Sequence, residues 1–342
     1  MFYIGVVGLG YWGPNLVRNL SENRLCNRLA ICDQDAGNLE KIKLRYPAAV
    51  PYSNYDEMLA DKDLQGVMIA TPIMSHFELA RKALLAGKHV FVEKPFTSST
   101  AQAAELVSLA EARNLRLGVG HTFEYSPPVT KIRDIIDSGE LGEIFYISST
   151  RVNLGLHYKD LSVIWDLAPH DLSMIMYWLG ETPTEVLATG KDFVQKGICD
   201  VAFLNLKFAS GAIAHVQVSW LAPSKLRRTT IVGSAKMLVY DDTEHLEPVK
   251  IYDKGVNYKD PGSFGEFQLS YRTGDIVSPK VESFEPLQAE VNDFLVAILQ
   301  ERHPRADGED GLRVVQVLEA AENSMNDAGS TQMIEDLKVT DQ

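Results

Sequence analysis

Three groups of residues in this 342-residue chain have types and spacings that suit chemistry. The first is a glycine-rich turn, Gly8-Leu9-Gly10-Tyr11-Trp12-Gly13, which directly follows an apolar run. The second is Glu93-Lys94-Pro95, which places an acid and an amine after another apolar run. The third is Asp166 and His170, an acid and an imidazole four positions apart. A glycine turn before a helix suits a phosphate, and the other two groups suit proton transfer.

The glycine turn matches G-x-G-x-x-G in a context that favours dinucleotide binding. A strand is expected before it and a helix after it, at the start of a region where the two alternate. Gly8 permits the tight turn, Gly10 lets the backbone approach a pyrophosphate, and Gly13 lets the helix pack closely on the strand. We therefore expect the whole turn, Tyr11 and Trp12 included, to bind a dinucleotide; a plain structural turn is the alternative.

Asp33 ends the second apolar run, 20 positions after Gly13. A carboxylate at this place accepts hydrogen bonds from the adenosine ribose hydroxyls and repels a 2′-phosphate. Gln34 and Asp35 follow it, so no arginine stands directly after it to receive such a phosphate. The sequence favours NAD over NADP as the cofactor; a solvated acid at a strand end is the alternative reading of Asp33.

Further strand ends are expected to complete the cofactor site, because ligands of such sheets bind beyond the carboxyl edge. Pro95 restricts the backbone directly after Lys94, which argues against an ordinary mobile surface lysine. His121 is expected near the same edge. The cofactor contacts expected here are Thr71, Pro72, His76, Glu93 and Lys94.

On a helix, Asp166 and His170 would lie on one face about one turn apart. A neighbouring carboxylate raises the basicity of an imidazole and fixes its tautomer, which suits a general base. Pro169 complicates this interpretation, because a proline inside a helix removes a backbone hydrogen bond, so the helix could instead begin near it. A capping carboxylate beside a structural histidine is the equal alternative.

Composition excludes several classes of protein. The chain carries 46 acidic and 33 basic residues, a net charge of −13, which disfavours binding to nucleic acid or to an anionic membrane. Its three cysteines show no metal-ligand spacing and do not pair in number, so we expect no disulfide scaffold and no metal site. No apolar run has the roughly 18 residues of a membrane span, and the N-terminus has no signal-peptide pattern. We expect a cytoplasmic protein.

Periodicity predicts two domains, at residues 1–121 and 122–342. In the first, apolar strands alternate with helices, as in a doubly wound parallel sheet. The second has an α+β pattern with a mostly antiparallel sheet, and 253–281 is expected to be a long loop because it is rich in glycine, proline and serine. Strands are predicted at 3–8, 28–33, 48–52, 66–70, 89–93, 116–120, 143–153, 186–189, 201–208, 212–219, 226–232, 236–240 and 249–252, and helices at 14–21, 36–45, 54–60, 74–86, 100–113, 129–137, 162–179, 287–301 and 311–323.

In this order and at these separations, the glycine turn, Glu93-Lys94-Pro95 and Asp166-x-x-x-His170 resemble the Gfo/Idh/MocA oxidoreductases over essentially the whole chain. The resemblance implies an N-terminal Rossmann domain and a C-terminal α+β domain whose open sheet builds a homodimer or homotetramer. It also implies that Lys94, Asp166 and His170 are catalytic, and that hydride passes between NAD and a ring carbinol of a sugar, cyclitol or nucleotide sugar.

The local sequence is most similar to the branch acting on nucleotide-linked sugars, such as dehydrogenases of the 3-hydroxyl of UDP-linked N-acetylated hexuronic acids. The segments that carry this likeness are residues 10–15, 120–123 and 165–171. One departure is Ser173, where many members have an aspartate, while Asp171 directly follows His170. The resemblance places substrate contacts at Lys94, His121, Tyr125, Arg151, Asn153 and His170, and cations for a UDP group are available at Arg151, Lys159, Lys225, Arg227 and Arg228.

Two other functions remain open. A glycosidase of the same family would oxidise and then re-reduce its sugar, so that NAD undergoes no net change. A non-catalytic NAD-binding regulator would need none of Lys94, Asp166 and His170, so the presence of all three argues against it.

Overall fold

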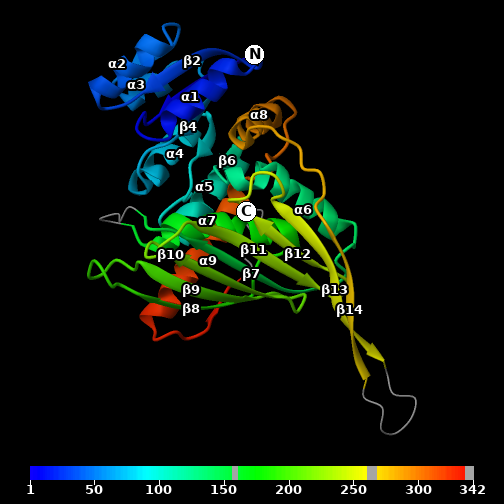
Figure 1. Ribbon diagram of the computed structural model, residues 1–342. Coiled ribbons are helices and arrows are strands. Elements are labelled where there is room, and N and C mark those ends of the chain that lie inside the picture. The colour runs from blue at the N-terminus through cyan, green and yellow to red at the C-terminus, as the bar shows by residue number, and fades with distance from the viewer. Residues whose placement is uncertain (156–160, 260–267, 336–342) are drawn as a thin grey trace. The chain divides into compact units, whose positions relative to one another are not determined.

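The computed structural model describes residues 1–155, 161–259 and 268–335 (Figure 1). The chain divides into two compact units. The first contains Met1–Tyr125 and Phe284–Glu319, and the second contains Ser126–Ser283 and Ala320–Glu335. The first unit is therefore completed by a segment that returns to it from late in the chain.

The first unit is built on a parallel sheet of six strands in the order β3-β2-β1-β4-β5-β6. This confirms the predicted doubly wound sheet, and the strand order changes direction beside β1, where the glycine turn follows. Parallel strands of this kind have continuous apolar sequences because both faces of the sheet are covered. The strands are β1 (Phe2–Val7), β2 (Cys26–Cys32), β3 (Val50–Tyr52), β4 (Gly66–Ile69), β5 (His89–Val92) and β6 (Leu117–Val119).

Helices of the first unit begin at residues suited to the first turn. Pro14 lies in the first turn of α1, where its missing N–H costs no hydrogen bond. Asp35 caps α2 by accepting from the backbone N–H groups of Gly37 and Asn38, and Ser99 caps α5. The elements are α1 (Gly13–Glu22), α2 (Ala36–Arg45), α3 (Tyr55–Leu59), η1 (Ile73–Ser75), α4 (His76–Leu85), α5 (Thr100–Ala112), η2 (Thr122–Tyr125), α8 (Pro286–Leu299) and the first part of α9 (Gly308–Asn326). Within the described ranges, no helix has the length and apolarity required to cross a membrane.

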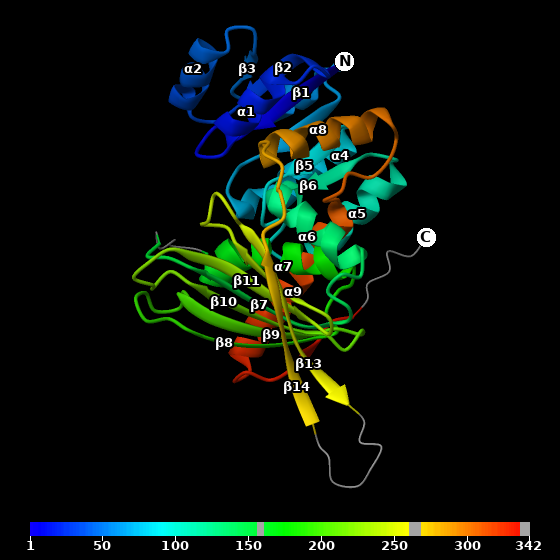
Figure 2. The ribbon, with the colours of Figure 1, turned by 45° about the vertical axis from the view of Figure 1, so that its right-hand side comes forward.

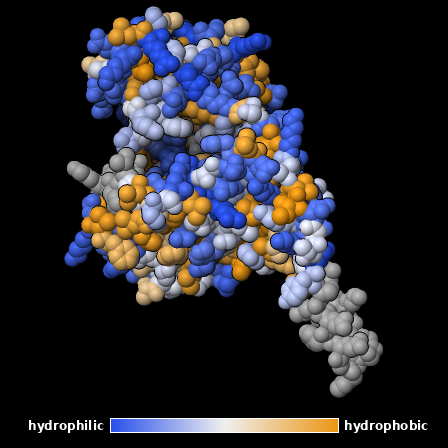
Figure 3. All heavy atoms as spheres, in the orientation of Figure 1, coloured by the Kyte–Doolittle hydropathy of each residue, from blue (hydrophilic) through white to orange (hydrophobic). Residues whose placement is uncertain are grey.

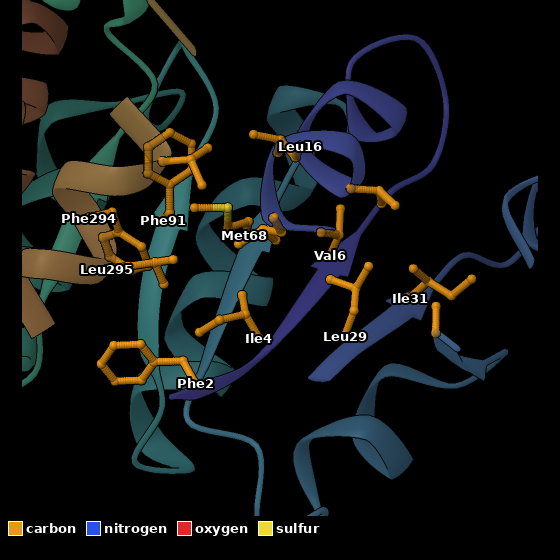
Figure 4. Close-up of a cluster of buried hydrophobic side chains, with 14 of the residues drawn as sticks. Phe2, Ile4, Val6, Leu16, Leu29, Ile31, Met68, Phe91, Phe294 and Leu295 are labelled. Atoms are coloured by element: carbon orange, nitrogen blue, oxygen red, sulfur yellow. The ribbon is translucent and has the colours of Figure 1, made fainter. Parts of the chain in front are cut away.

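The core of the first unit joins the sheet to the returning helix α8 (Figure 4). Ile4 of β1 and Leu16 of α1 are fully buried in one cluster with Phe91 of β5 and Phe294 of α8. The rings of Phe91 and Phe294 meet edge to face with centroids 5.7 Å apart. Aromatic side chains supply a large share of core energy, so α8 is an integral part of this unit.

The second unit contains a nine-stranded sheet in the order β14-β13-β12-β11-β7-β10-β9-β8-β15. All its pairs are antiparallel except β7 with β10, which confirms the mostly antiparallel prediction. Helix α7 (Val163–Leu179) contacts β7, β9 and β10, and α6 (Pro127–Asp137) packs on α7. The strands are β7 (Ile144–Val152), β8 (Glu185–Lys191), β9 (Val201–Lys207), β10 (Ile213–Ser219), β11 (Leu226–Gly233), β12 (Met237–Asp241), β13 (Val249–Lys259), β14 (Gln268–Val277) and β15 (Gln332–Met333).

Alternation along β9 indicates that, in the described part of the chain, helices cover one face of this sheet. Ala202, Leu204 and Leu206 are buried, whereas Phe203 and Asn205 between them are exposed. Strand side chains alternate between faces, so the exposed set lies on the face away from α7. Figure 3 shows apolar side chains exposed among polar ones on the visible surface of this unit.

The predicted long loop at 253–281 is wrong over most of its described length. β13 and β14 pair there as an antiparallel ribbon, which Figure 2 shows as a narrow two-stranded arm of the second sheet. β-Forming residues are spread among the glycines and charges, with Tyr252 and Val256 on one strand and Tyr271 and Ile276 on the other. A ribbon with exposed faces tolerates polar residues and glycine, so its composition looks like that of a loop.

Candidate active site

The glycine turn after β1 has the steric properties that a dinucleotide needs. Gly8 has a φ of +86°, and a Cβ there would lie 2.6 Å from the carbonyl oxygen of Ala70. A Cβ on Gly13 would lie 1.9 Å from the carbonyl oxygen of Gly8, so α1 packs closer to the turn than any other residue allows. A Cβ on Gly10 would meet nothing within 4 Å. The backbone at Gly10 is therefore open to an approaching diphosphate, and the residues fit an NAD cofactor.

Tyr11 and Trp12, which occupy the middle of this turn, have different environments. Tyr11 is 92% exposed. Trp12 is partly buried and packs against the core cluster of the first unit. Tyr11 is thus accessible to a ligand, whereas Trp12 anchors the turn.

Asp33 stands at the carboxyl end of β2 beside the glycine turn. Its Oδ2 accepts a hydrogen bond from the backbone N–H of Leu9 at 2.6 Å, and its Oδ1 accepts from the N–H of Asp35 at 2.8 Å. The carboxylate is held between the turn and the start of α2. This is the place from which an acid meets the adenosine ribose of a dinucleotide.

His76 connects the chain ends that follow β4 and β5. Its Nε2 lies 2.8 Å from the carbonyl oxygen of Thr71, and its Nδ1 lies 2.8 Å from that of Pro95. Burial lowers the pKa of His76, and the two carbonyl groups oppose that shift. The peptide bond between Lys94 and Pro95 is cis. His76 therefore positions Thr71-Pro72 and Lys94-Pro95 relative to each other.

Glu93 is buried where β5 ends. Its side chain packs against Gly120, where a Cβ would lie 2.8 Å from its Oε2, and that oxygen accepts the backbone N–H of Lys94 at 3.3 Å. Burial raises the pKa of Glu93 to about 8. His121 is also buried, and the loss of solvent lowers the pKa of its imidazole to about 4. Both side chains thus favour their neutral forms near pH 7.

Tyr125 is buried in a polar network of the first unit. Its hydroxyl donates to Oδ2 of Asp293 at 2.8 Å and accepts from the backbone N–H of Ala306 at 3.1 Å. The guanidinium carbon of Arg305 lies 4.9 Å from its ring centroid. These contacts tie the turn after β6 to the returning segment.

Helix α7 of the second unit carries Asp166 and His170. The helix begins at Val163 and continues through Pro169, so both side chains lie within it at one-turn spacing. The indole Nε1 of Trp220, directly after β10, donates to Oδ2 of Asp166 at 3.1 Å. Asp166 is therefore fixed by a strand-end tryptophan, one turn before His170 on the helix.

Arg151, a sequence-predicted substrate contact, lies in the interior of the second unit and is 3% exposed. Its Nε donates to Oδ2 of Asp171 at 2.6 Å, and the Ser149 hydroxyl donates to Oδ1 of the same carboxylate at 2.6 Å. Thr229 of β11 lies 2.9 Å from that hydroxyl. Asp171 directly follows His170, so this buried cluster anchors the histidine's turn of α7 to β7 and β11.

One edge of the second sheet gathers further polar residues. β7 and β10 end there and β11 begins there, because Val152 pairs with both Ser219 and Leu226. Asn153 follows β7 and donates its backbone N–H to Ser219, and Arg227 of β11 bonds Asp242 at 3.1 Å. Arg228 is exposed and points to the opposite face, and Lys159 lies outside the described residues.

The two units therefore each hold part of the predicted site. The first brings the glycine turn, Asp33, Thr71, His76 and Glu93-Lys94 to the carboxyl ends of β1, β2, β4 and β5. The second holds Asp166, His170 and Asn153 near one sheet edge. Sequence reasoning missed Trp220, the bond of Asp171 to Arg151, and Glu290, a buried acid of α8. Glu290 has a sequence signal, because Leu287, Val291 and Phe294 place it on the apolar face of its helix.

Comparisons with known proteins identify the same two parts. Residues 2–121 match the model of an oxidoreductase family with an NAD-binding Rossmann fold, and residues 129–239 match the GFO/IDH/MocA C-terminal domain. The chain is 28% identical over 314 residues to UDP-N-acetylglucosamine 3-dehydrogenase of Acidithiobacillus ferrooxidans, covering 91% of this chain and 93% of that one. It is 26% identical over 332 residues to inositol 2-dehydrogenase of Rhizobium meliloti, covering 94% and 96%.

A solved structure extends the likeness to three dimensions. The structure of the Acidithiobacillus ferrooxidans UDP-N-acetylglucosamine 3-dehydrogenase GnnA superposes with a TM-score of 0.75 at 27% identity, over 94% of this chain and 95% of that one. Both domain matches, in order along one chain with the glycine turn and Glu93-Lys94-Pro95, give one conclusion. The chain belongs to the Gfo/Idh/MocA family of NAD-binding oxidoreductases.

Proposed function

We propose that this protein oxidises a ring carbinol of a nucleotide-linked sugar, with NAD as hydride acceptor. The observation that carries the proposal is the acid–imidazole pair of α7, in which Trp220 holds the carboxylate of Asp166 one turn before His170. An oriented carboxylate beside an imidazole is the arrangement of a general base. The likeness to a UDP-N-acetylglucosamine dehydrogenase supports the choice of substrate class.

In the proposed mechanism, the chain's own residues manage the proton and the developing charge. NAD, when bound by the glycine turn and Asp33, supplies the carbon that accepts hydride. His170 takes the proton of the sugar hydroxyl, and Asp166 stabilises the resulting imidazolium. Lys94 donates a hydrogen bond to the same oxygen while the carbinol becomes a carbonyl. The meeting of Lys94 and His170 on one oxygen is part of this proposal.

The base assignment is tested by His170→Asn, with His215→Asn as a matched control. His215 lies on β10 of the same unit and bonds Asn205 on the exposed face. We expect kcat to fall by about a hundredfold or more in His170→Asn, because general base catalysis contributes that much, while the Kd for NAD stays unchanged. Wild-type kcat in His170→Asn would contradict the assignment. A pH–rate profile of His170→Asn and Lys94→Met separates the roles of the two groups.

The nucleotide part of the substrate is tested at the start of β11. Arg227 pairs in register with Arg151 and so lies on the α7 face, whereas Arg228 lies on the other face. We propose that Arg227 meets the anionic diphosphate. Arg227→Ala should raise KM for the UDP-linked sugar about tenfold, the value of one charge-assisted hydrogen bond, without raising KM for the unlinked sugar. Equal effects from Arg228→Ala would contradict this placement.

We further propose a cytoplasmic homodimer or homotetramer. The three cysteines are all free, which suits a reducing compartment. The face of the nine-stranded sheet away from α7 exposes Phe203, Ile213 and Tyr146 among polar residues, and we propose that a second copy of this chain covers it.

A further inference from the structure

A buried carboxylate holds the turn between β8 and β9 in the second unit. Asp200 is fully buried, and its Oδ2 accepts the backbone N–H groups of Phe193 and Val194, each at 2.8 Å. Hydrogen bonds to a charged acceptor are stronger than those between neutral groups. The side chain of Asp200 therefore fixes the turn to the residue directly before β9.

The backbone at this position joins three further segments. Asp200 donates its N–H to the carbonyl oxygen of Lys191 at 3.1 Å, at the end of β8. The carbonyl oxygen of Asp200 accepts the N–H of Trp220 at 3.0 Å. The carbonyl oxygen of Cys199 accepts the N–H of Val163 at 2.9 Å. These two adjacent residues thus bond the end of β8, the residue after β10 and the first residue of α7.

Two of those bonds hold the elements on which the acid of α7 depends. The N-cap residue Ser162 makes no capping bond with its side chain, so the carbonyl group of Cys199 provides the acceptor for the first N–H of α7. Trp220 is 1% exposed, and its indole Nε1 donates to Oδ2 of Asp166 at 3.1 Å. The start of the helix and the donor to its acid are therefore both held by the segment that contains Asp200.

The turn has little packing of its own. Phe193 and Val194 are 67% and 59% exposed, so their side chains do not anchor it. In the described part of the chain, Oδ1 of Asp200 is buried and has no hydrogen-bond partner. A buried carboxylate oxygen without a donor costs free energy. This cost indicates that the contribution of Asp200 is the geometry that it fixes.

We propose that Asp200 is a positioning residue that acts on Asp166 through Trp220. Its side chain fixes residues 199–200, whose carbonyl groups hold Trp220 and the start of α7. Trp220 then orients the carboxylate of Asp166, which stabilises the imidazolium of His170 during proton transfer. A displacement of about 1 Å can slow a reaction about a hundredfold, so a residue that acts only through others can affect kcat. This inference rests on the proposed function, in which Asp166 and His170 carry the chemistry.

The kinetic test compares two substitutions of Asp200 in the whole protein. Asp200→Ser removes the charged acceptor, so kcat should fall about ten- to a hundredfold with a smaller change in KM for the sugar. The Kd for NAD should stay unchanged, because the glycine turn and Asp33 belong to the first unit. Asp200→Asn keeps one oxygen for the two N–H groups, so it should restore most of the activity. If Asp200→Ser does not fold, Asp200→Glu, which displaces the turn by one methylene, takes its place.

A double-mutant cycle tests whether Asp200 and Trp220 act in series. Trp220→Phe removes the indole donor and keeps an aromatic ring, so kcat should fall about tenfold or more. The double variant Asp200→Ser with Trp220→Phe should be no slower than the slower single variant, because both changes remove the same orientation of Asp166.

Asp192→Ala is the matched control in the same turn. Oδ2 of Asp192 accepts the N–H of Gly197 at 2.7 Å, and this bond lies within the turn. The substitution therefore loosens the turn and leaves the bonds of residues 199–200 in place. The kcat of Asp192→Ala should equal that of the wild type.

A second measurement needs no substrate. The chain has four tryptophans, and labelling them with a nitrogen isotope gives one indole N–H signal for each in an NMR spectrum. The signal that disappears in Trp220→Phe identifies Trp220. This signal should shift in Asp200→Ser in the same direction as in Asp166→Asn, where the acceptor has lost its charge. It should keep its wild-type position in Asp192→Ala.

The outcomes separate this inference from the proposed function. Losses of kcat that multiply in the double variant, or an unshifted Trp220 signal in Asp200→Ser, would overturn the inference while leaving dehydrogenase activity intact. An equal loss of kcat in Asp192→Ala would also overturn it, because any disturbance of the turn would then suffice. A shifted signal in a protein that oxidises no sugar would uphold the link from Asp200 to Asp166 and contradict the proposed function.

Discussion

At the scale of single residues, we propose that the choice of NAD over NADP rests on Asp33. Its carboxylate is held at the glycine turn by the N–H of Leu9, and at α2 by the N–H of Asp35. Asp33→Ala should raise the Kd for NAD about tenfold or more, because a hydrogen bond to a charged group contributes about 1.5–3 kcal/mol. It should also reduce the discrimination against NADP, whose 2′-phosphate no longer meets a negative charge.

The neighbouring acid provides the control for this prediction. Asp35 caps α2 and so supports local stability. Asp35→Ala should lower the melting temperature without changing the ratio of NAD to NADP affinities. Titration of both cofactors into both variants is the measurement. An Asp33→Ala protein that binds NAD as wild type does would contradict the role of Asp33.

His121 should make the protein sensitive to acid. Burial lowers its pKa from 6.5 to about 4 in the folded state, so the unfolded chain binds more protons in that range. The stability that its neutral form supports is therefore present above pH 6.5 and is lost as pH falls toward 4, by at most about 3 kcal/mol. Glu93 has the opposite effect because its pKa is raised: its contribution lowers the free energy of unfolding as pH rises above the usual pKa of a glutamate.

Denaturant unfolding between pH 7 and 4 checks this, as the difference between wild type and His121→Gln. The variant should lose less stability on acidification than the wild type. His245→Gln, at an exposed histidine, should follow the wild-type curve. An unchanged acid dependence in His121→Gln would show that another group is responsible.

Some site residues were predictable from sequence because their demands are local. The positive φ of Gly8 and the contact between Gly13 and the Gly8 carbonyl oxygen both arise within the turn, so the spacing of these glycines predicts it. Trp220 and Glu290 each interact with a group far away in the chain, and only the fold brings each of them to its own partner. The helical spacing of Glu290 indicates burial but not what it is buried against.

At the scale of elements, α7 depends on a buried ion pair. Arg151 of β7 and Asp171 of α7 are nearly inaccessible to solvent, and Ser149 completes the carboxylate's bonds. Arg151→Met or Asp171→Leu alone should destabilise the protein by about 3–5 kcal/mol, because each leaves one buried charge without its partner. The double variant should be more stable than either single variant, since neither charge remains.

A double-mutant cycle of unfolding free energies tests this coupling. Arg133→Met and Asp137→Leu form the control cycle, because they disrupt a partly exposed pair on α6 whose contribution is expected to be small. Additive effects of the Arg151 and Asp171 substitutions would contradict the role of the buried pair.

Most elements were predictable because the order of apolar and polar residues within each element indicates which side chains are buried. The alternation of buried and exposed residues on β9 and the apolar run of β1 both indicate their strands directly. The ribbon of β13 and β14 was missed, because exposed strands have no apolar face to reveal them. Pro169 suggested that α7 could begin near it. The helix instead begins before Pro169 and continues through it, because packing on the sheet outweighs one lost hydrogen bond.

At the scale of the whole molecule, the uncovered sheet face predicts self-association. Register places Phe203 of β9, Ile213 of β10 and Tyr146 of β7 on one face, and all three are exposed. Such a surface is typical of an interface. Phe203→Lys combined with Ile213→Lys should reduce the molar mass measured by light scattering to that of one chain. Leu44→Lys, at an exposed leucine of α2, should leave it unchanged.

Sequence periodicity could not predict that α8 belongs to the first unit. Phe294 packs on Phe91, yet more than 200 residues separate them along the chain. An apolar helix pattern predicts that a helix buries one face, but not which sheet receives it. Assignment of helices to units therefore required the structure.

The most direct test of the central claim follows the hydride itself. A UDP-linked N-acetylated sugar, deuterated at the carbinol carbon, is incubated with the protein and NAD⁺, and the reduced cofactor is analysed by mass spectrometry. The account predicts one deuterium transferred to the cofactor for each sugar converted to its ketone, and loss of this transfer in His170→Asn. Cleavage of the sugar linkage without accumulation of reduced cofactor would contradict it.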